Sequence, residues 1–485
     1  MASSSLSPGY PPSPLTPLDN LVFGIYDHKV LFFPASGSDV SSIAQNLTSA
    51  LAQTFKAIPL LSGTITPLPD ARQKGRWAVT APWRTSEDVI TVKDLRETDY
   101  PSYESLRSKH FPMSDINYPV MMPTQFSMLF QKVKSPVVEN PVLLAQINYF
   151  KGGISLGMMI SHAFTDGSGS VTVGRVWAAY CRGEDGSQLV SPDLVDRSRL
   201  MEGENSARIE DLGDHLYYAE SAQPPSKPKS EPFAGELFFF TKAKLKELKE
   251  MVSKLESDET SWISTNDALA SLIWCCVIAA KKACILDNLV VHSINDDTSS
   301  LKDFLDDQPS RLGFLMDARQ MAKPPLPAGF IGNVFTWGSI VKPLSTVTST
   351  PEGVTECAHS LRRKVKQYGD NYLPRLIGAV NSVPDISRVR LGRTDLDEWS
   401  FGVNSWAAMD WYDLDWGQLV GGRVERIRIQ ESKAMKFCRV LPEIKYYEGR
   451  NEAAGLEVII SMETYEMKIL RENELFNRFA EWRCC

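Results

Sequence analysis

The sequence predicts a mixed α/β protein built from two halves that share a cleft. The chain has 485 residues, which is too long for one ordinary hydrophobic core, so two domains are expected. Short apolar runs rich in β-branched residues, typical of buried strands, outnumber helical patterns in the first half. A polar, proline-rich stretch near the middle, Gln223–Lys229, indicates an exposed connector between the halves.

These signals divide the chain into four segments. Residues 1–17 are rich in serine and proline and are expected to form a disordered tail. Residues 18–190 are expected to form an N-terminal domain, residues 191–232 a crossover linker, and residues 233–485 a C-terminal domain. No convincing internal repeat is present.

Alternating and apolar runs place the elements of the N-terminal domain. The expected strands are 21–33, 63–66, 77–81, 125–133, 143–150 and 154–161. A helical apolar period covers Val40–Phe55 and ends near Pro59. A second helix should follow Asp166, because apolar side chains recur at roughly helical spacing from Val171 to Tyr180.

The C-terminal domain continues the mixed pattern. Strands are expected at 237–241, 311–316, 334–340, 401–404 and 456–460. One helix is expected to follow the strand at 237–241 and to run through Leu255. Further helices are expected over 265–280, 354–366 and 463–482. The helix at 265–280 should start at Ser264, because Ser264 to Asp267 forms a good capping sequence before an apolar body.

The composition excludes several classes of protein. Hydrophobic residues make up 43% and charged residues 23%, values typical of soluble globular proteins. The net charge of -7 is spread along the chain, whereas nucleic-acid binding needs a concentrated basic face. The amino terminus lacks a secretory signal, and the most apolar helix body, 268–280, is too short to cross a bilayer. A soluble, cytoplasmic protein without a membrane segment is expected.

The eight cysteines lack the spacing of a zinc site or of a secreted disulfide framework, so no metal is expected and a reducing compartment fits best. The terminal pair Cys484–Cys485 could be a double-prenylation tail. It lacks the C-a-a-X form, however, and its flanking residues are typical of an ordinary helix end.

The stretch Ile160–Gly169 carries the strongest chemical signal. It places His162 four residues before Asp166 at a strand-to-helix junction, with Asp166 placed to cap the following helix. A neutral imidazole at such a mouth can take a proton from a hydroxyl, because the usual pKa of histidine is about 6.5. A lone histidine is more often structural, and the spacing alone leaves both interpretations open.

A competing motif is Gly153–Gly157, which matches the G-x-S-x-G of a hydrolase nucleophile elbow. That elbow needs a sharp strand-to-helix turn at the serine, whereas here the extended pattern continues to Ile160. The sequence also contains no H-E-x-x-H, no phosphate-binding P-loop and no complete dinucleotide fingerprint, so zinc, nucleotide hydrolysis and hydride transfer lose support.

The arrangement of His162, Asp166 and Gly167 resembles the H-x-x-x-D-G signature of the coenzyme A-dependent acyltransferases of the BAHD family. Other marks of that family follow in the same order along nearly the whole chain: Pro17-Leu18-Asp19, Ser264 to Ala270, Met316 to Arg319, Gly329 to Asn333, and Asn404-Ser405-Trp406. The late D-F-G-W-G motif survives only as Asp415-Trp416-Gly417-Gln418-Leu419. This departure resembles the divergent fungal branch that includes trichothecene 3-O-acetyltransferases.

The resemblance implies a fold of two chloramphenicol acetyltransferase-like domains, each a mixed sheet flanked by helices, with a tunnel between them. It also implies that His162 deprotonates an acceptor hydroxyl or amine, which attacks the thioester of acyl-CoA, most commonly acetyl-CoA, without an acyl-enzyme. Asp166 would pair with Arg319 and have an architectural role. The product would be an acylated specialised metabolite, and a monomer would suffice because the two halves already build the tunnel.

The same resemblance assigns further residues. Asn404 stands where a threonine is common and is the candidate donor to the oxyanion. Asp415 and Gly417 are expected to be structural, with an arginine holding the loop of Asp415. Backbone and side-chain donors at Ser264, Thr265, Gly332 and Asn333 are the candidate contacts for coenzyme A. Aromatic residues that could line an acceptor pocket are Phe23, Phe33, Phe330, Trp337, Trp406 and Trp411.

Two rival functions remain open. Condensation-type or N-acyl transfer would use a carrier-protein thioester or an amine, but no carrier domain is present, and such domains usually have a second histidine where Ser161 stands. A non-catalytic homologue that only binds a ligand is favoured by the altered second motif.

Overall fold

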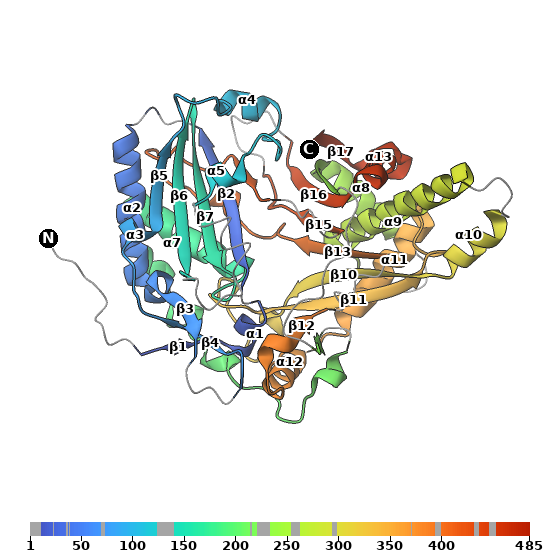
Figure 1. The fold of residues 1–485 in the computed structure, drawn as a ribbon, viewed down its shortest axis with the longest axis horizontal. Coiled ribbons are helices and arrows are strands. Elements are labelled where there is room, and N and C mark those ends of the chain that lie inside the picture. Colours follow the sequence, from blue (N-terminus) through green and yellow to red (C-terminus); the bar gives the residue numbers. More distant parts are fainter. Residues whose placement is uncertain are drawn as a thin grey trace.

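The structure is a computed structural model that describes residues 11–22, 24–34, 37, 39–68, 73–123, 140–213, 216–220, 233–253, 262–292, 298–369, 371–392, 399–430, 436–445 and 453–485. Two lobes lie side by side, each containing a large sheet with helices packed against it (Figure 1). This arrangement confirms the predicted α/β fold.

The N-terminal lobe is organised around a sheet of five described strands in the order β14-β2-β7-β6-β5. Its strands are β2 (Tyr26–Pro34), β5 (Ile90–Asp94), β6 (Leu143–Phe150), β7 (Gly153–Ser161) and β14 (Arg426–Arg428). All neighbouring pairs are antiparallel except β5 with β6. Every residue of β6 and β7 is buried, as their continuous apolar runs predict.

Two long helices, α2 (Val40–Ala57) and α7 (Gly167–Cys181), pack against each other and against this sheet (Figure 1). Short elements complete the lobe: β1 (Ser13–Pro14), α1 (Pro17–Asn20), β3 (Thr64–Pro67), β4 (Trp77–Thr80), α3 (Ser86–Val89), α4 (Tyr103–Ser108) and α5 (Tyr118–Met121). The order β1-β4-β3 forms a small separate sheet.

The C-terminal lobe contains a sheet of seven described strands in the order β11-β10-β13-β15-β16-β9-β17. Its strands are β9 (Phe233–Thr241), β10 (Pro309–Asp317), β11 (Phe335–Pro343), β13 (Ser400–Ser405), β15 (Phe437–Val440), β16 (Gly455–Glu463) and β17 (Glu481–Cys484). The parallel pairs β10 with β13 and β13 with β15 carry the carboxyl ends of β13 and β15 to one edge, beside the other lobe.

Helices cover this second sheet (Figure 1): α8 (Lys242–Val252), α9 (Thr265–His292), α11 (Pro351–Lys366), α13 (Thr464–Glu472) and α14 (Glu474–Phe479). Helix α10 (Thr298–Asp306) lies at the outer end of the lobe, just before β10. The pair β8 (Leu216–Tyr218) and β12 (Val389–Leu391) and helix α12 (Tyr372–Asn381) form a smaller subdomain near the small sheet of the N-terminal lobe.

One segment crosses from the C-terminal half back into the N-terminal lobe. Trp411 and Trp416 are fully buried in the N-terminal core, and β14 pairs with β2 at the edge of the five-stranded sheet. At the same seam, the guanidinium of Arg428 donates two hydrogen bonds to Glu457 of β16, at 2.8 and 3.0 Å. The expected domain boundary at residues 191–232 therefore does not account for this later segment, which returns to the N-terminal lobe. Nothing in the local composition indicates that return.

Most strands and helices lie within a few residues of their expected positions, and the exceptions have physical reasons. The expected helix over 463–482 is wrong at its end. Helices α13 and α14 end at Phe479 and the chain then enters β17, so Cys484 is the last residue of a strand and Cys485 follows it. Within the expected tail, residues 13–14 pair with β4, and Thr16 caps α1. Residues 1–10, Phe23 and the expected strand 125–133 lie outside the described residues.

Helix α9 is longer than the expected 265–280. Its segment Thr265–Asp287 is long and apolar enough to span a membrane by length and composition, with 67% of the tested window buried inside the protein. The argument that this helix is too short to cross a bilayer is therefore wrong. The burial of its apolar side chains in the C-terminal core is what a soluble core helix would show.

Candidate functional site

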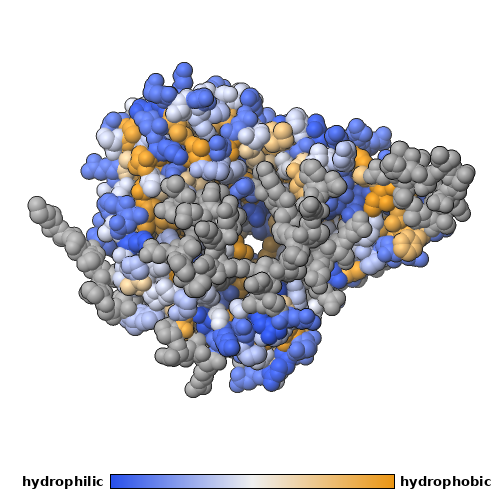
Figure 2. Space-filling model, in the orientation of Figure 1, coloured by the Kyte–Doolittle hydropathy of each residue, from blue (hydrophilic) through white to orange (hydrophobic). Residues whose placement is uncertain are grey.

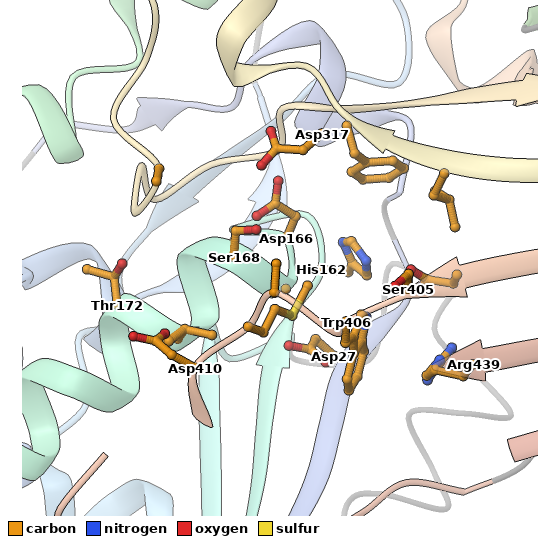
Figure 3. Close-up of a pocket in the computed structure, with 18 of the residues that line it drawn as sticks. Asp27, His162, Asp166, Ser168, Thr172, Asp317, Ser405, Trp406, Asp410 and Arg439 are labelled. Atoms are coloured by element: carbon orange, nitrogen blue, oxygen red, sulfur yellow. The ribbon is translucent and has the colours of Figure 1, made fainter. Parts of the chain in front are cut away.

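A cavity of about 1080 Å³ lies where the two lobes meet. The N-terminal lobe contributes the start of β2, the turn after β7 and the first turns of α7, and the C-terminal lobe contributes the ends of β10, β13 and β15. Figure 2 shows an opening between the lobes near the centre of that view, and Figure 3 shows side chains of both lobes around the cavity. The cavity agrees with the expected site between two domains.

His162 stands on the cavity wall directly after β7. Its backbone N–H donates to the carbonyl of Ile25 at 2.8 Å, which joins the turn after β7 to the start of β2. Its ring lies 5.6 Å from the ring of Phe335, measured between centroids. The turn therefore projects the imidazole from the N-terminal lobe toward β11 of the other lobe (Figure 3).

The side chain of Asn333 sets the orientation of this imidazole. Its amide nitrogen donates to the backbone carbonyl of His162 at 2.6 Å and to Asp19 at 2.8 Å. The amide oxygen must then face Nδ1 of His162, which lies 3.1 Å away, and can only accept a hydrogen bond from it. This network places the proton on Nδ1, so the lone pair of the neutral ring is on Nε2.

Asp19 anchors Asn333 in turn. Its Oδ1 accepts from both the backbone N–H and the amide of Asn333, and its Oδ2 accepts from Arg197 at 2.7 Å. Arg197 also donates to the carbonyl of Phe164, two residues after the histidine. Asp19 is fully buried. The sequence marked this residue within Pro17-Leu18-Asp19, but nothing in the motif alone indicated that it supports the histidine.

Asp166 has the architectural position that the resemblance implies. Its Oδ1 caps α7 by accepting from the N–H of Gly169 and also accepts from Arg319 at 2.7 Å. Its Oδ2 accepts from the N–H of Val334. Burial alone would lower the pKa of Arg319, but the carboxylates of Asp166 and Asp317 offset it and the pKa is raised. Asp166 therefore ties the turn after His162 to the segment that carries Asn333.

The opposite wall comes from β13 and β15. Asn404, Ser405 and Trp406 line the cavity, and Arg439 of β15 lies beside them in register with Asn404 (Figure 3). The guanidinium of Arg439 stacks on the Trp406 ring, 4.8 Å from its centroid. Among the residues that the structure describes, neither Asn404 nor Ser405 makes a side-chain hydrogen bond, so both keep donors that can serve a bound reactant.

A buried ion pair borders this wall. Lys29 donates to Asp27 at 2.6 Å, and the ammonium lies over the rings of Trp411 and Trp406 at 4.8 and 5.7 Å from their centroids. Burial alone would raise the pKa of Asp27, but Lys29 lowers it to about 2. The carboxylate of Asp27 is therefore ionised and neutralised by Lys29. Sequence analysis missed both residues, because β2 gave only an apolar strand signal.

Asp415 and Gly417 lie outside the cavity lining and shape a turn. Asp415 accepts from the N–H of Gly417 at 2.8 Å, and its backbone carbonyl accepts from Arg182. Gly417 has a positive φ of 86°, a conformation that favours glycine. The tryptophan between them packs its ring against Phe33 and Trp177. In the described contacts the Asp415 carboxylate does not pair with an arginine as expected; Arg182 binds the backbone carbonyl instead.

The candidate coenzyme contacts are not on the cavity wall. Ser264 forms a capping box with Asp267 at the start of α9, which occupies its hydroxyl, and Thr265 begins the helix itself. Asn333 lies behind the histidine, fully buried. Gly332 is next to it, where an added Cβ would lie 2.5 Å from the ring of Phe330. None of the four lines the described cavity.

Of the described aromatic residues expected to line an acceptor pocket, one lines the cavity and the others do not. Trp406 lines the cavity, whereas Phe33 and Phe330 are fully buried in hydrophobic cores. Trp411 is buried in the N-terminal core, and Trp337 lies against the backbones of Gly313 and Gly392. The aromatic residues that join Trp406 at the cavity are Tyr26, Phe335 and Phe437. Aromatic character predicts burial in general and does not distinguish a cavity wall from a core.

Two family models match this chain. The model described as the Transferase family matches residues 112–476, and the model described as the trichothecene 3-O-acetyltransferase-like N-terminal domain matches residues 25–181. The first match covers His162, Arg319 and the β13 wall. The two lobes, the cavity between them and these matches define an acyltransferase. The chain belongs to the Transferase family, which confirms the resemblance to BAHD enzymes.

Curated relatives of similar length include an acyltransferase, easC, from Emericella nidulans. It is 25% identical over 97% of this chain and 95% of its own length. Acyltransferase BOA11 of Botryotinia fuckeliana is 27% identical over 78% of this chain and 79% of its own length.

Solved structures agree in fold. The Fusarium sporotrichioides TRI101 complex with coenzyme A and T-2 has a TM-score of 0.77 at 20% identity, covering 98% of this chain and all of that chain. Vinorine synthase has a TM-score of 0.63 at 17% identity, covering 97% of this chain and 94% of that one. The two-domain fold that the sequence predicted is thereby confirmed.

Proposed function

We propose that this acyltransferase moves an acyl group, expected to be acetyl, from coenzyme A to a hydroxyl of a small specialised metabolite, with His162 as the general base. The observation that carries the proposal is the hydrogen bond from Nδ1 of His162 to Asn333, which leaves Nε2 without a described partner on the cavity wall. An imidazole in this state can accept a proton from the cavity and later return it.

The reaction follows from this geometry in two proton transfers. The acceptor hydroxyl gives its proton to Nε2 of His162 while its oxygen attacks the thioester carbonyl carbon. A tetrahedral oxyanion forms. When it collapses, the carbon–sulfur bond breaks, and the departing thiolate takes the proton back from Nε2. Ester and free thiol are released, and the histidine returns to its neutral form without a covalent intermediate on the protein.

The oxyanion needs a donor from the opposite wall. The amide of Asn404 and the hydroxyl of Ser405 both line the cavity and make no described side-chain hydrogen bond. Either can donate to an oxygen that develops negative charge, and such preorganised donors act most strongly in a cavity that excludes bulk water. Asn404 is our first choice, by its place in the family motif.

Support for the two reactants comes from relatives. TRI101 structures are complexes with coenzyme A and either T-2 or deoxynivalenol, and two Aspergillus niger relatives are named O-acetyltransferases. A cavity of about 1080 Å³ can hold an acyl thioester and a small acceptor together. Transfer to an amine and transfer from a carrier-protein thioester are the rival reactions.

The proposal is tested by mixing purified protein with acetyl-CoA and a panel of hydroxylated metabolites and by measuring free thiol. His162→Ala should lower the transfer rate by roughly 10²- to 10⁴-fold. His359→Gln is the matched control, because His359 is buried on α11 and bonds the carbonyl of Val252 away from the cavity.

A His162→Ala protein as active as the wild type would contradict the role of the base. Release of thiol only from carrier-bound thioesters would favour condensation, and ligand binding without any thiol release would favour a non-catalytic homologue.

A further inference from the structure

Arg439 is a cation on the cavity wall for which the structure gives no anionic partner. It points from β15 into the cavity, surrounded by protein but with part of its surface open to the cavity. Its Nε is buried and has no hydrogen-bond partner, and no described carboxylate forms an ion pair with the guanidinium. Its described contacts are with the faces of Trp406 and Phe437.

The other charges at this wall do not compensate Arg439. Asp27 is the carboxylate that acts on it electrostatically, but Asp27 is already held by Lys29 at 2.6 Å. The three side chains together therefore keep one positive charge. Burial lowers the pKa of Arg439, yet a guanidinium stays protonated at any physiological pH. The wall thus presents a positive charge to whatever enters the cavity.

Arg439 also lies near the reacting centre. Asp27 interacts electrostatically with both His162 and Arg439, and Figure 3 shows His162, Trp406 and Arg439 around the same cavity. Arg439 is in register with Asn404, the candidate oxyanion donor. A group that reaches Arg439 therefore belongs to a reactant whose other end lies at His162.

We propose that Arg439 recognises a carboxylate carried by one of the two reactants, and this inference rests on the proposed acyl transfer. A planar guanidinium with free N–H donors matches a carboxylate with two parallel hydrogen bonds. The guanidinium lies over the Trp406 ring, 4.8 Å from its centroid, and this contact restrains the side chain before a ligand binds. The carboxylate can belong to the acceptor or to the acyl group, as in malonyl-CoA.

The experiment compares reactants that differ only in this charge. In the acceptor arm, acetyl-CoA is given with 4-hydroxyphenylacetate or its methyl ester. In the donor arm, malonyl-CoA or acetyl-CoA is given with one neutral alcohol. In a binding arm without turnover, benzoate and benzamide are titrated at constant ionic strength, with tryptophan fluorescence as the signal. Each arm uses wild-type protein, Arg439→Gln and Arg311→Gln, a control on the same sheet outside the cavity.

The wild type should prefer the anionic reactant in one of the two transfer arms, and benzoate over benzamide. Arg439→Gln should lower kcat/KM for that anionic reactant by roughly 10- to 100-fold and change the neutral one by less than about 3-fold. Arg311→Gln should leave both unchanged. Preference in the acceptor arm assigns the carboxylate to the acceptor, and preference in the donor arm assigns it to the acyl group.

Equal loss for charged and neutral reactants would overturn the inference, because that result is expected if Arg439 only supports the Trp406 ring. Equal binding of benzoate and benzamide by the wild type would also overturn it, while leaving acyl transfer intact. Preferential benzoate binding with no thiol released from either donor would instead contradict the proposed function.

Discussion

The two walls of the cavity are built on opposite principles. On the histidine side, both carboxylate oxygens of Asp19 and of Asp166 and the whole amide of Asn333 are engaged in hydrogen bonds within the protein. On the β13 and β15 side, Asn404 and Ser405 have no described side-chain partner, and Arg439 has no described anion. The hydrogen bonds of the first wall hold the imidazole of His162 in place. The donors of the second wall are available to bound molecules.

The comparison teaches where catalysis and specificity reside. A network whose carboxylate and amide groups are all paired fixes geometry before any ligand arrives, because moving one member would leave another buried polar group unpaired. Unpaired donors do not fix the geometry of the empty site. They gain a hydrogen bond only when a bound reactant supplies an acceptor, so they stabilise that reactant. Changes on the histidine side should therefore affect folding and every substrate alike, whereas changes on the facing wall should distinguish between reactants or reaction steps.

Apart from loss of the His162 base itself, the largest expected effect on the reaction rate is on the facing wall. If Asn404 is the oxyanion donor, Asn404→Ala lowers kcat by roughly 10²- to 10³-fold with little change in KM, because the lost hydrogen bond forms mainly in the transition state. Ser405→Ala is the matched control one residue away and should lose far less. Steady-state thiol release measures both. The reverse ranking would move the role to Ser405.

Substitutions in the network that supports His162 should instead lower the stability of the protein. Arg319→Met leaves Asp166 as an uncompensated buried charge and should lower the free energy of unfolding by about 3–5 kcal/mol. Adding Asp166→Asn should recover part of that loss, because the buried charge is removed. Urea titration followed by circular dichroism measures both proteins. A loss below about 1 kcal/mol in the single variant would mean that the network is not paired in the way described.

A smaller, pH-dependent effect is expected from His28, which also lines the cavity. Burial, aided by Arg439, lowers the pKa of His28 to about 4, while an unfolded histidine keeps a value near 6.5. Between pH 6.5 and 4 the unfolded chain therefore binds a proton that the folded chain does not, so stability falls as the pH falls.

His28→Gln should make this slope shallower by up to about 1.4 kcal/mol per pH unit within that window, with little change above pH 7. Urea titrations at pH 7.5, 6, 5 and 4.5 provide the comparison. Identical slopes for wild type and variant would show that Arg439 and the surrounding wall do not keep His28 neutral.

Local patterns predicted the parts of the site that are local. Buried strand, turn and capped helix follow one another in Ile160–Gly169, and the structure has β7, the turn of His162 and α7 there. The role of Asn333 could not be found this way, because its partners Asp19 and His162 are 314 and 171 residues away in sequence. Only the packing of the two lobes brings them together.

The same limit explains the missed elements. Strand β15 (Phe437–Val440) has only four residues, too few for a periodic signal, yet it supplies Phe437 and Arg439 to the cavity. Strand β17 was taken for the end of a helix, because pairing with β9 overrides the local preference of Glu481–Cys484. Local preference cannot report the neighbours that tertiary structure provides.

The most direct test of the base is the protonation state of the two ring nitrogens of His162. Protein labelled with ¹⁵N-histidine is measured by NMR at pH 8, where an ordinary imidazole is neutral, with His162→Gln used to assign the signal. We predict a proton on Nδ1 and none on Nε2, and we predict that Asn333→Ala lets the proton distribute over both nitrogens. A proton fixed on Nε2 in the wild-type protein would contradict the account.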